Sequence, residues 1–106
     1  MAGLAQRQVA HAALAKTLVD QPDRAVWHAA AATVGPDEAV AAQLEATALR
    51  ARRRGAATVA VSALRRSVAL TEVPARRGAR LLAAAELAIE LAEHDEVTQL
   101  ERAWAP

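Results

Sequence analysis

The stretch from Gly35 to Glu72 constrains the fold most strongly, because its helix-start signals, helix-stop signals and apolar spacing all agree. Pro36 fits the first turn of a helix, where a backbone N–H has no partner within the helix. Asp37 and Glu38 then place negative charge at the positive end of the helix dipole. Arginines fill the turn before Gly55, a residue type that often ends a helix in the left-handed conformation. The stretch therefore predicts two helices joined by a tight turn at Gly55.

Each predicted helix of this hairpin carries apolar or small residues at the spacing of one helical face. In the first helix these residues are Val40, Leu44, Thr47 and Ala48. In the second helix they are Ala57, Ala60, Val61, Leu64 and Val68, and Arg65 and Arg66 fall on the other side. We expect the second helix to stop before Pro74, since the residue before a proline disfavours helical backbone.

The segment before the hairpin shows the same helical period. We expect a helix over about residues 4–19, a turn around Pro22, and a short helix over about residues 24–34. The inner face of the short helix is expected to hold Trp27, Ala30, Ala31 and Val34.

The segment after the hairpin predicts a long helix from Pro74 to about Ala92, a break at His94 and Asp95, and a last short helix. The expected inner stripe of the long helix is Leu81, Leu82, Ala85, Ala88, Ile89 and Ala92. The last helix is expected to turn Val97 and Leu100 inward. Trp104 has two open interpretations: it packs on these two residues, or it belongs to a surface that a further repeat or another copy of the chain covers.

These elements make an all-α chain with helix pairs at about 4–34, 36–72 and 74–104, and we expect one domain over residues 1–106. Placing Pro36 over Pro74 gives a period of about 38 residues, which lies within the range of helical repeats. Alanine and arginine dominate, and only 2% of the residues are aromatic. That composition favours helices that approach closely through small side chains, so we expect antiparallel helical hairpins stacked on one another.

Charge and residue usage exclude several classes of function. A formal net charge of +1 gives no global electrostatic case for binding nucleic acid or an anionic membrane. The absence of cysteine excludes disulfides, thiolate metal sites and thiol nucleophiles. The sequence lacks both the run of about 18 apolar residues that a membrane helix needs and the apolar segment of a signal peptide. We therefore expect a cytoplasmic protein that does not bind membranes.

No residue pattern specifies a reaction, so we expect no enzyme, no catalytic residue, no cofactor and no metal. The histidines lack the spacing of paired metal ligands, and no carboxylate constellation accompanies them; they are His11, His28 and His94. The carboxylates Glu86, Glu90 and Glu93 indicate a solvated acidic face, because acid–base catalysis needs a pocket that perturbs their pKa values.

A cluster of arginines precedes Gly55 and consists of Arg50, Arg52, Arg53 and Arg54. We interpret it first as positive charge that stabilises the negative end of the helix dipole. Contact with phosphate or with an acidic partner is the alternative, although the scarcity of aromatic residues suits nucleic acid poorly. If the chain has an interaction surface, the candidate residues are Arg50, Arg53, Arg54, Leu100 and Trp104.

Several segments together resemble the helical-repeat region of large ATP-dependent LuxR-type transcriptional regulators. They are Arg24-Ala25-Val26-Trp27-His28, Gly35-Pro36-Asp37-Glu38 with Val40-Ala41 and Leu44-Glu45, Arg53-Arg54-Gly55-Ala56-Ala57, Ala63-Leu64-Arg65-Arg66, Leu70-Thr71, Pro74-Ala75-Arg76-Arg77 and Arg80-Leu81-Leu82-Ala83-Ala84-Ala85. The resemblance implies a tetratricopeptide-like repeat array between an ATPase and a helix-turn-helix. The chain departs from the family in having neither a phosphate-binding loop nor a recognition-helix module. Glu72 also stands where the tetratricopeptide repeat often has proline.

The resemblance implies a fragment of a longer protein: a non-enzymatic protein-interaction or sensory arm that couples signal input to DNA-binding output. Its expected partner is protein, either the neighbouring domains of the same regulator or a second copy of the chain as a homodimer. We expect no direct contact between this segment and nucleic acid. The alternative from another class is a free-standing helical oligomerisation or scaffold module.

Overall fold

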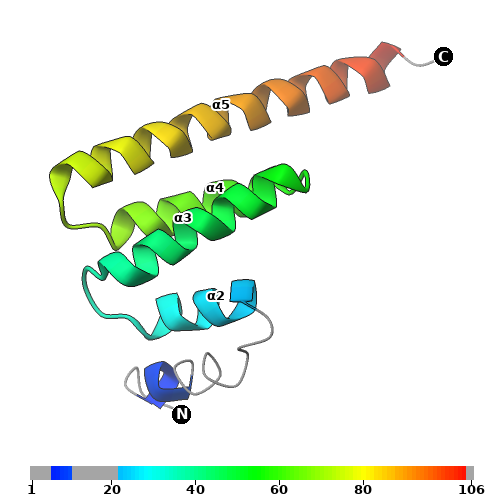
Figure 1. Cartoon of the computed structure of the whole chain (residues 1–106). Coiled ribbons are helices and arrows are strands. Elements are labelled where there is room, and N and C mark those ends of the chain that lie inside the picture. Colours follow the sequence, from blue (N-terminus) through cyan, green and yellow to red (C-terminus); the bar gives the residue numbers. More distant parts are fainter. Residues whose placement is uncertain (1–5, 11–21, 105–106) are drawn as a thin grey trace.

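The computed structural model describes residues 6–10 and 22–104, and within these residues it contains helices and no strand. The helices are α2 (Pro22–Ala32), α3 (Glu38–Arg53), α4 (Ala57–Ala69) and α5 (Pro74–Trp104), and residues 6–10 are also helical. Figure 1 shows the α3–α4 hairpin between α2 on one side and α5 on the other. The all-α class is confirmed for this part of the chain. Most of the helix expected over 4–19 lies outside the described residues.

The predicted hairpin is present, with caps at both ends of α3. The side chain of Asp37 accepts a hydrogen bond from the Val40 N–H at 3.1 Å, so Asp37 is the N-cap and Pro36 precedes the helix instead of occupying its first turn. At the other end Gly55 has a φ of +81°. Its N–H donates to the Arg52 carbonyl at 3.1 Å, and the next N–H, of Ala56, donates to the Ala51 carbonyl at 2.8 Å. This pair of bonds satisfies the last carbonyls of α3 and turns the chain into α4.

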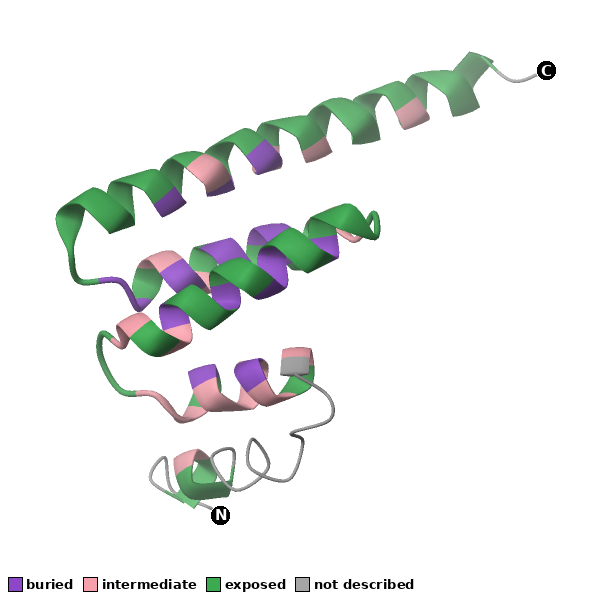
Figure 2. Ribbon diagram, in the orientation of Figure 1, coloured by how far each residue is buried: buried purple, intermediate pink, exposed green. Residues whose placement is uncertain are grey.

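Small side chains let α3 and α4 pack closely along their length (Figure 2). The hydroxyl of Ser67 on α4 donates to the Ala41 carbonyl on α3 at 2.7 Å, and both residues are fully buried. A second hydrogen bond joins the start of α3 to the end of α4, where the Asp37 N–H donates to the Leu70 carbonyl at 2.8 Å. The alanines in this contact are 0–3% exposed and are Ala41, Ala48, Ala51, Ala60 and Ala63.

Helix α2 covers the other side of α3 with Val26 and Ala30, which join Leu44 in one buried cluster. Trp27 is half-buried and packs against both clusters of the core, as expected of an inward residue. The prediction that Val34 points inward is wrong, because its side chain is 78% exposed. Helix α2 ends two residues earlier, at Ala32, and Gly35 then turns the chain with a φ of +77°.

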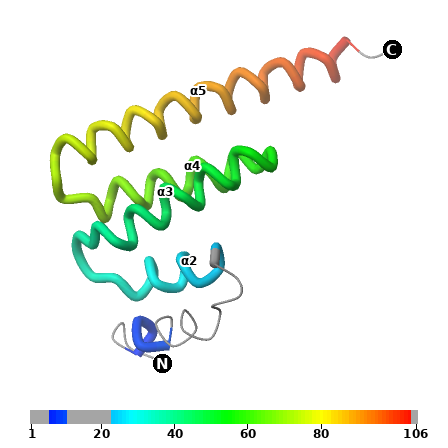
Figure 3. The backbone as a smooth tube through the Cα atoms, in the orientation of Figure 1, coloured from blue at the N-terminus to red at the C-terminus, as the bar shows by residue number. Residues whose placement is uncertain are grey.

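Helix α5 runs without a break over 31 residues, so the predicted break at His94 and Asp95, and with it the third helix pair, is wrong (Figure 3). Neither residue breaks a helix by itself: in an exposed position each lowers helix propensity by less than about 1 kcal/mol, which the continuing helix absorbs. The Thr98 hydroxyl also donates to the His94 carbonyl at 2.9 Å, one turn back.

The inner stripe of α5 also differs from the predicted one. The buried residues are Arg80, Ala84 and Leu87, whereas Leu81, Leu82 and Ile89 are 57%, 60% and 58% exposed. Both stripes have helical spacing, and alanines fill the positions between them, so hydrophobicity alone does not determine the rotation of the helix. The hydrogen bonds of the Arg80 side chain, described below, lie on the buried stripe.

The rotation of α5 generates a stability test with a matched pair of leucines. We expect Leu87→Ala, at 5% exposure, to lower the free energy of unfolding by about 2–5 kcal/mol, because the truncation leaves a cavity against α4. Leu82→Ala should change it by less than about 1 kcal/mol, because that side chain is mostly in solvent. Urea denaturation followed by circular dichroism measures both. The reverse order would show that the predicted stripe, and not the observed one, faces the hairpin.

Candidate interaction site

A groove of about 410 Å³ runs between α3 and α5, with α4 beneath it. Its floor is apolar and includes Leu64 of α4 and Leu87 of α5, while Leu49 of α3, 49% exposed, stands on its wall. The charged side chains on its lining are Glu45, Arg52 and Glu86. The remaining lining residues are alanines, Ala42, Ala46, Ala48 and Ala83. The groove exists because the small alanine side chains on its lining leave space where α3 and α5 flank α4.

A buried guanidinium lies beside one end of this groove, where its partner Glu45 belongs to the lining. Both terminal nitrogens of Arg80 donate to the Glu38 carboxylate, at 2.8 and 2.7 Å, and Nε donates to Glu45 at 3.2 Å. One terminal nitrogen also donates to the Thr71 hydroxyl at 2.7 Å, and that hydroxyl donates in turn to the Ser67 carbonyl at 2.7 Å. The Arg80 side chain is only 6% exposed. The network therefore ties the start of α3, the end of α4 and the second turn of α5 together in fixed geometry.

An exposed ion pair lies at the other end of the groove. One terminal nitrogen of Arg52 donates to both oxygens of Glu90, at 3.1 and 3.2 Å, and both side chains are more than half exposed. Exposed pairs of this kind add little to stability. In the described part of the chain Glu86, between the two ends, forms no ion pair. The groove thus offers an apolar floor with an unpaired carboxylate beside it, which suits a bound side chain with apolar and cationic parts.

A second charged cluster lies on the side of α3 that faces α2. The Asp23 carboxylate accepts from Arg50 at 2.6 and 3.0 Å and from Arg54 at 3.4 Å. The buried hydroxyl of Thr47 lies within the same cluster, 3.4 Å from Asp23 and 3.2 Å from Arg50. The guanidinium of Arg66 on α4 donates to the Ala30 carbonyl at 3.1 Å and so satisfies one of the last carbonyls of α2. These contacts hold α2 against the hairpin.

The ion pairs lower the pKa values of two carboxyl groups. Hydrogen bonds from Arg80 hold the pKa of Glu38 below its usual value of 4.5, and the charges of Arg80 and Arg76 act in the same direction. Hydrogen bonds from Arg50 hold the pKa of Asp23 below its usual value of 3.8, against a smaller opposing effect of burial. The pKa of Arg80 is raised, chiefly by its hydrogen bond to Glu38. All three groups are therefore charged at neutral pH.

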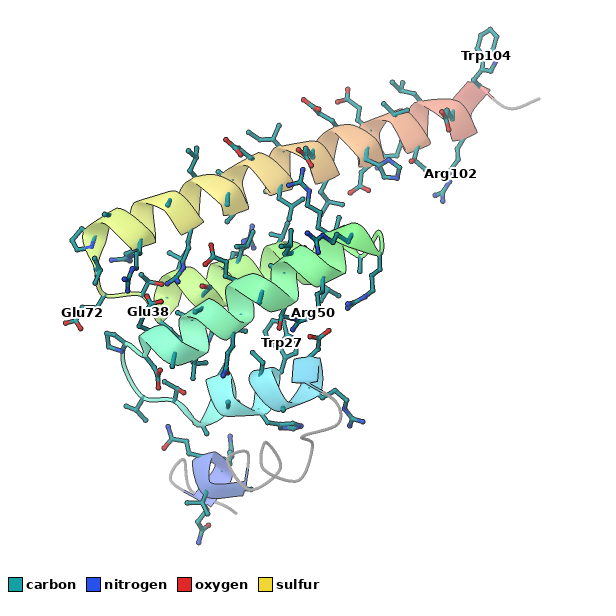
Figure 4. The ribbon with its side chains drawn as sticks, viewed as in Figure 1. Trp27, Glu38, Arg50, Glu72, Arg102 and Trp104 are labelled. Carbon is teal, nitrogen blue, oxygen red and sulfur yellow. The ribbon has the colours of Figure 1, made fainter. Side chains whose placement is uncertain are left out.

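The interaction residues predicted from the sequence do not form one surface. Arg50 and Arg54 converge on Asp23, which matches a structural role, and Arg53 is exposed and forms no ion pair with the described residues. Leu100 and Trp104 are 63% and 89% exposed. Figure 4 shows Trp104 at the free end of α5 and Arg50 on the side of α3 that faces α2, where its side chain is 46% exposed. Of the two interpretations of Trp104, packing on Val97 and Leu100 is not supported, because the Trp104 side chain is 89% exposed.

The histidines give no metal site in the part of the chain that the structure describes. Within residues 6–10 and 22–104, no three His, Cys, Asp or Glu side chains lie close enough together to hold a metal ion. His28 lies half-buried on α2, His94 is exposed on α5, and His11 falls outside the described residues. The acidic face predicted on α5 is exposed, and one of its members, Glu90, pairs with Arg52.

Sequence reasoning missed the Arg80 network. The usable signal was the alternative helical stripe of Arg80, Ala84, Leu87 and Leu91, in which a long cationic side chain occupies an apolar face. Its partners Glu38 and Glu45 lie 42 and 35 residues away, so no local spacing indicates the contact.

No protein-family model, curated protein or solved structure matches this chain. None of the described helices combines the length and apolar character needed to cross a lipid bilayer.

The depressed pKa values predict a defined acid sensitivity. A carboxyl group whose folded-state pKa is lowered adds stability that is complete above its unfolded-state pKa, and loses it as pH falls through the folded-state value. We therefore expect the free energy of unfolding to decrease as the pH is lowered from about 5 to about 2. Arg80→Met should reduce this slope, because Glu38 then keeps only the 3.6 Å contact with Arg76 and its pKa returns towards the ordinary value.

Urea denaturation at stepped pH values measures the slope. Arg53→Met is the control, because Arg53 forms no ion pair with the described residues and its removal should leave the slope unchanged. Equal slopes for the wild type and Arg80→Met would show that the Arg80–Glu38 contact does not persist in solution.

Proposed function

We propose that this chain is a protein-interaction or sensory arm, without catalytic activity, of a LuxR-type transcriptional regulator in the cytoplasm. The observation that carries the proposal is the groove between α3 and α5, with Leu64 and Leu87 on its floor and Glu86 beside it. Its volume of about 410 Å³ lies within the range of pockets that bury a ligand or an anchoring side chain. The proposal that the arm belongs to a LuxR-type regulator rests on the sequence resemblance.

Stacked helices give such an arm a way to transmit a signal. Each layer of the stack contacts only its neighbours, so small rotations between layers change the curvature of the whole array. The groove lies between two layers, since α3 and α5 both flank α4. A partner that fills it favours one spacing of α3 and α5 over another, and attached modules on either side respond to that shift. In this scheme the arm binds protein, and the DNA contact belongs to a separate module of the regulator.

The two ends of the groove differ in stiffness, so one end of α5 moves relative to α3 more easily than the other. The Arg80 network fixes the start of α5 to α3 through a side chain that is 6% exposed. The Arg52–Glu90 pair at the far end is exposed and weak. We therefore infer that α5 pivots about Arg80, and that the far end of the groove opens and closes.

Two measurements in the source organism test the regulator arm. An immunoblot with antibody against this chain should detect a protein several times heavier than 11.1 kDa, as expected if the arm is part of a larger regulator. Leu49→Glu in the chromosomal gene should then alter the same set of transcripts as deletion of the gene, because it places a charge on the wall of the groove.

Val59→Glu is the matched control, since Val59 is an apolar residue of α4, 37% exposed, that does not line the groove. Circular dichroism of both purified variants must first show an intact helical fold. A native protein of 11.1 kDa, or a deletion without effect on transcripts, would contradict the regulator. An unchanged transcript profile in Leu49→Glu alone would contradict the groove as its binding site.

A further inference from the structure

The groove between α3 and α5 is open on the side away from α4. All of its lining residues belong to three helices, with α4 as the floor and α3 and α5 as the two walls. An occupant therefore keeps contact with solvent on its outer side. Sites for small molecules bury about 70–90% of the ligand surface, which an open groove does not achieve. A segment of another protein brings its own cover for that side, so the shape of the groove suits a protein partner.

The groove is long enough for a short segment of such a partner. On α3 its lining begins at Ala42 and ends at Arg52, which corresponds to about 15 Å along the helix. Leu49 stands on this wall with 49% of its surface exposed, above Leu64 and Leu87 of the floor. A large apolar side chain placed here covers Leu49 and removes apolar surface of both molecules from water.

The charges of the groove distinguish a cationic partner from an anionic one, because its cations are already occupied. Arg52 donates two hydrogen bonds to Glu90. Arg80, beside the groove, makes four hydrogen bonds to two carboxylates and a hydroxyl. An anionic partner would have to displace these carboxylates from the guanidinium groups.

The carboxylate of Glu86 is in the opposite situation. It is exposed on the α5 wall and forms no ion pair with the described residues. A cation that pairs with Glu86 therefore breaks no ion pair of the described chain. The arrangement complements a partner with positive charge next to an apolar side chain.

We propose that the groove binds a basic amphipathic segment of a partner protein. A large apolar side chain of this segment packs on Leu49, Leu64 and Leu87, and an arginine beside it pairs with Glu86. Arginine suits the site because its planar guanidinium binds both oxygens of a carboxylate, while its methylene stem packs along apolar surface. The inference rests on the groove as the binding site of the interaction arm proposed above, and it adds the chemistry of the partner.

Selection from a random peptide library displayed on phage tests the partner chemistry. The probes are peptides of about 12 residues, which span about 18 Å even as a helix. They are selected on the immobilised 106-residue chain, and peptides that also bind the Leu49→Glu chain are removed because they bind outside the groove. We expect the remaining peptides to be enriched in arginine within one helical turn of a large apolar residue. Selection on the Glu86→Arg chain should lose this enrichment.

The affinity of one selected peptide, measured by fluorescence anisotropy, tests the ion pair itself. Glu86→Arg should weaken binding at least about tenfold, because it sets like charges against each other. A peptide with glutamate in place of its arginine should bind the wild-type chain weakly and the Glu86→Arg chain better than the original peptide does.

Glu93→Arg is the matched control. Glu93 is another exposed carboxylate of α5 that forms no ion pair with the described residues, and it does not line the groove. It lies about 10 Å further along the helix than Glu86, so its charge is largely screened at physiological salt. Its reversal should change the affinity by less than about twofold. Circular dichroism of each variant must show an intact helical fold.

The results separate the partner chemistry from the regulator. Groove-dependent peptides without a positive charge would overturn the proposal, and so would equal binding to the wild-type and Glu86→Arg chains or the absence of any peptide that depends on Leu49. If the proposal fails in this way while Leu49→Glu alters the transcripts, the groove is the binding site of an arm whose partner has another chemistry. If basic peptides bind as expected and deletion of the gene leaves the transcripts unchanged, the regulator is contradicted and the recognition of basic segments stands.

Discussion

The hydrogen bonds of Arg80 hold α3, α4 and α5 in their arrangement. Its guanidinium lies where α3 begins, α4 ends and α5 starts its second turn, and it binds Glu38, Glu45 and Thr71 at 2.7–3.2 Å. A buried cation that lost these partners would be strongly unfavourable, so the network permits only a narrow range of positions for α5. The rotation of α5, the width of the groove and the outward direction of its second apolar stripe all follow from this contact.

Alanine gives this protein both its close packing and its open surfaces. Five alanines and Ser67 bring α3 and α4 together, with a side-chain hydrogen bond to the Ala41 carbonyl at 2.7 Å. Four alanines among its lining residues also leave space for a groove between α3 and α5. A core with few large residues concentrates stability in Leu44, Leu64 and Leu87, whereas Leu49, Leu81, Leu82 and Leu100 are exposed.

Helix α5 is amphipathic in two directions. One stripe packs on α4, while the other faces solvent along the whole helix. In a stack of helices such a two-sided helix is an internal element, because each layer buries one face against the layer before and one against the layer after. The outward stripe of α5 has no partner among the described residues of this chain.

The sequence by itself determined the helical class, the α3–α4 hairpin and the turn at Gly55, because caps, dipole charges and apolar spacing are local signals that lie within a few residues of one another. It also located Trp27 at the core correctly. Only the tertiary structure decided the rotation and the unbroken length of α5, the outward position of Val34 and the burial of Arg80. The candidate groove likewise could not be predicted, because its lining comes from three helices that pattern alone does not place. The rotation of α5 and the burial of Arg80 depend on contacts between residues 35–42 positions apart. Two helical stripes of α5 have similar hydrophobicity, and the hydrogen bonds of Arg80 decide which of them is buried.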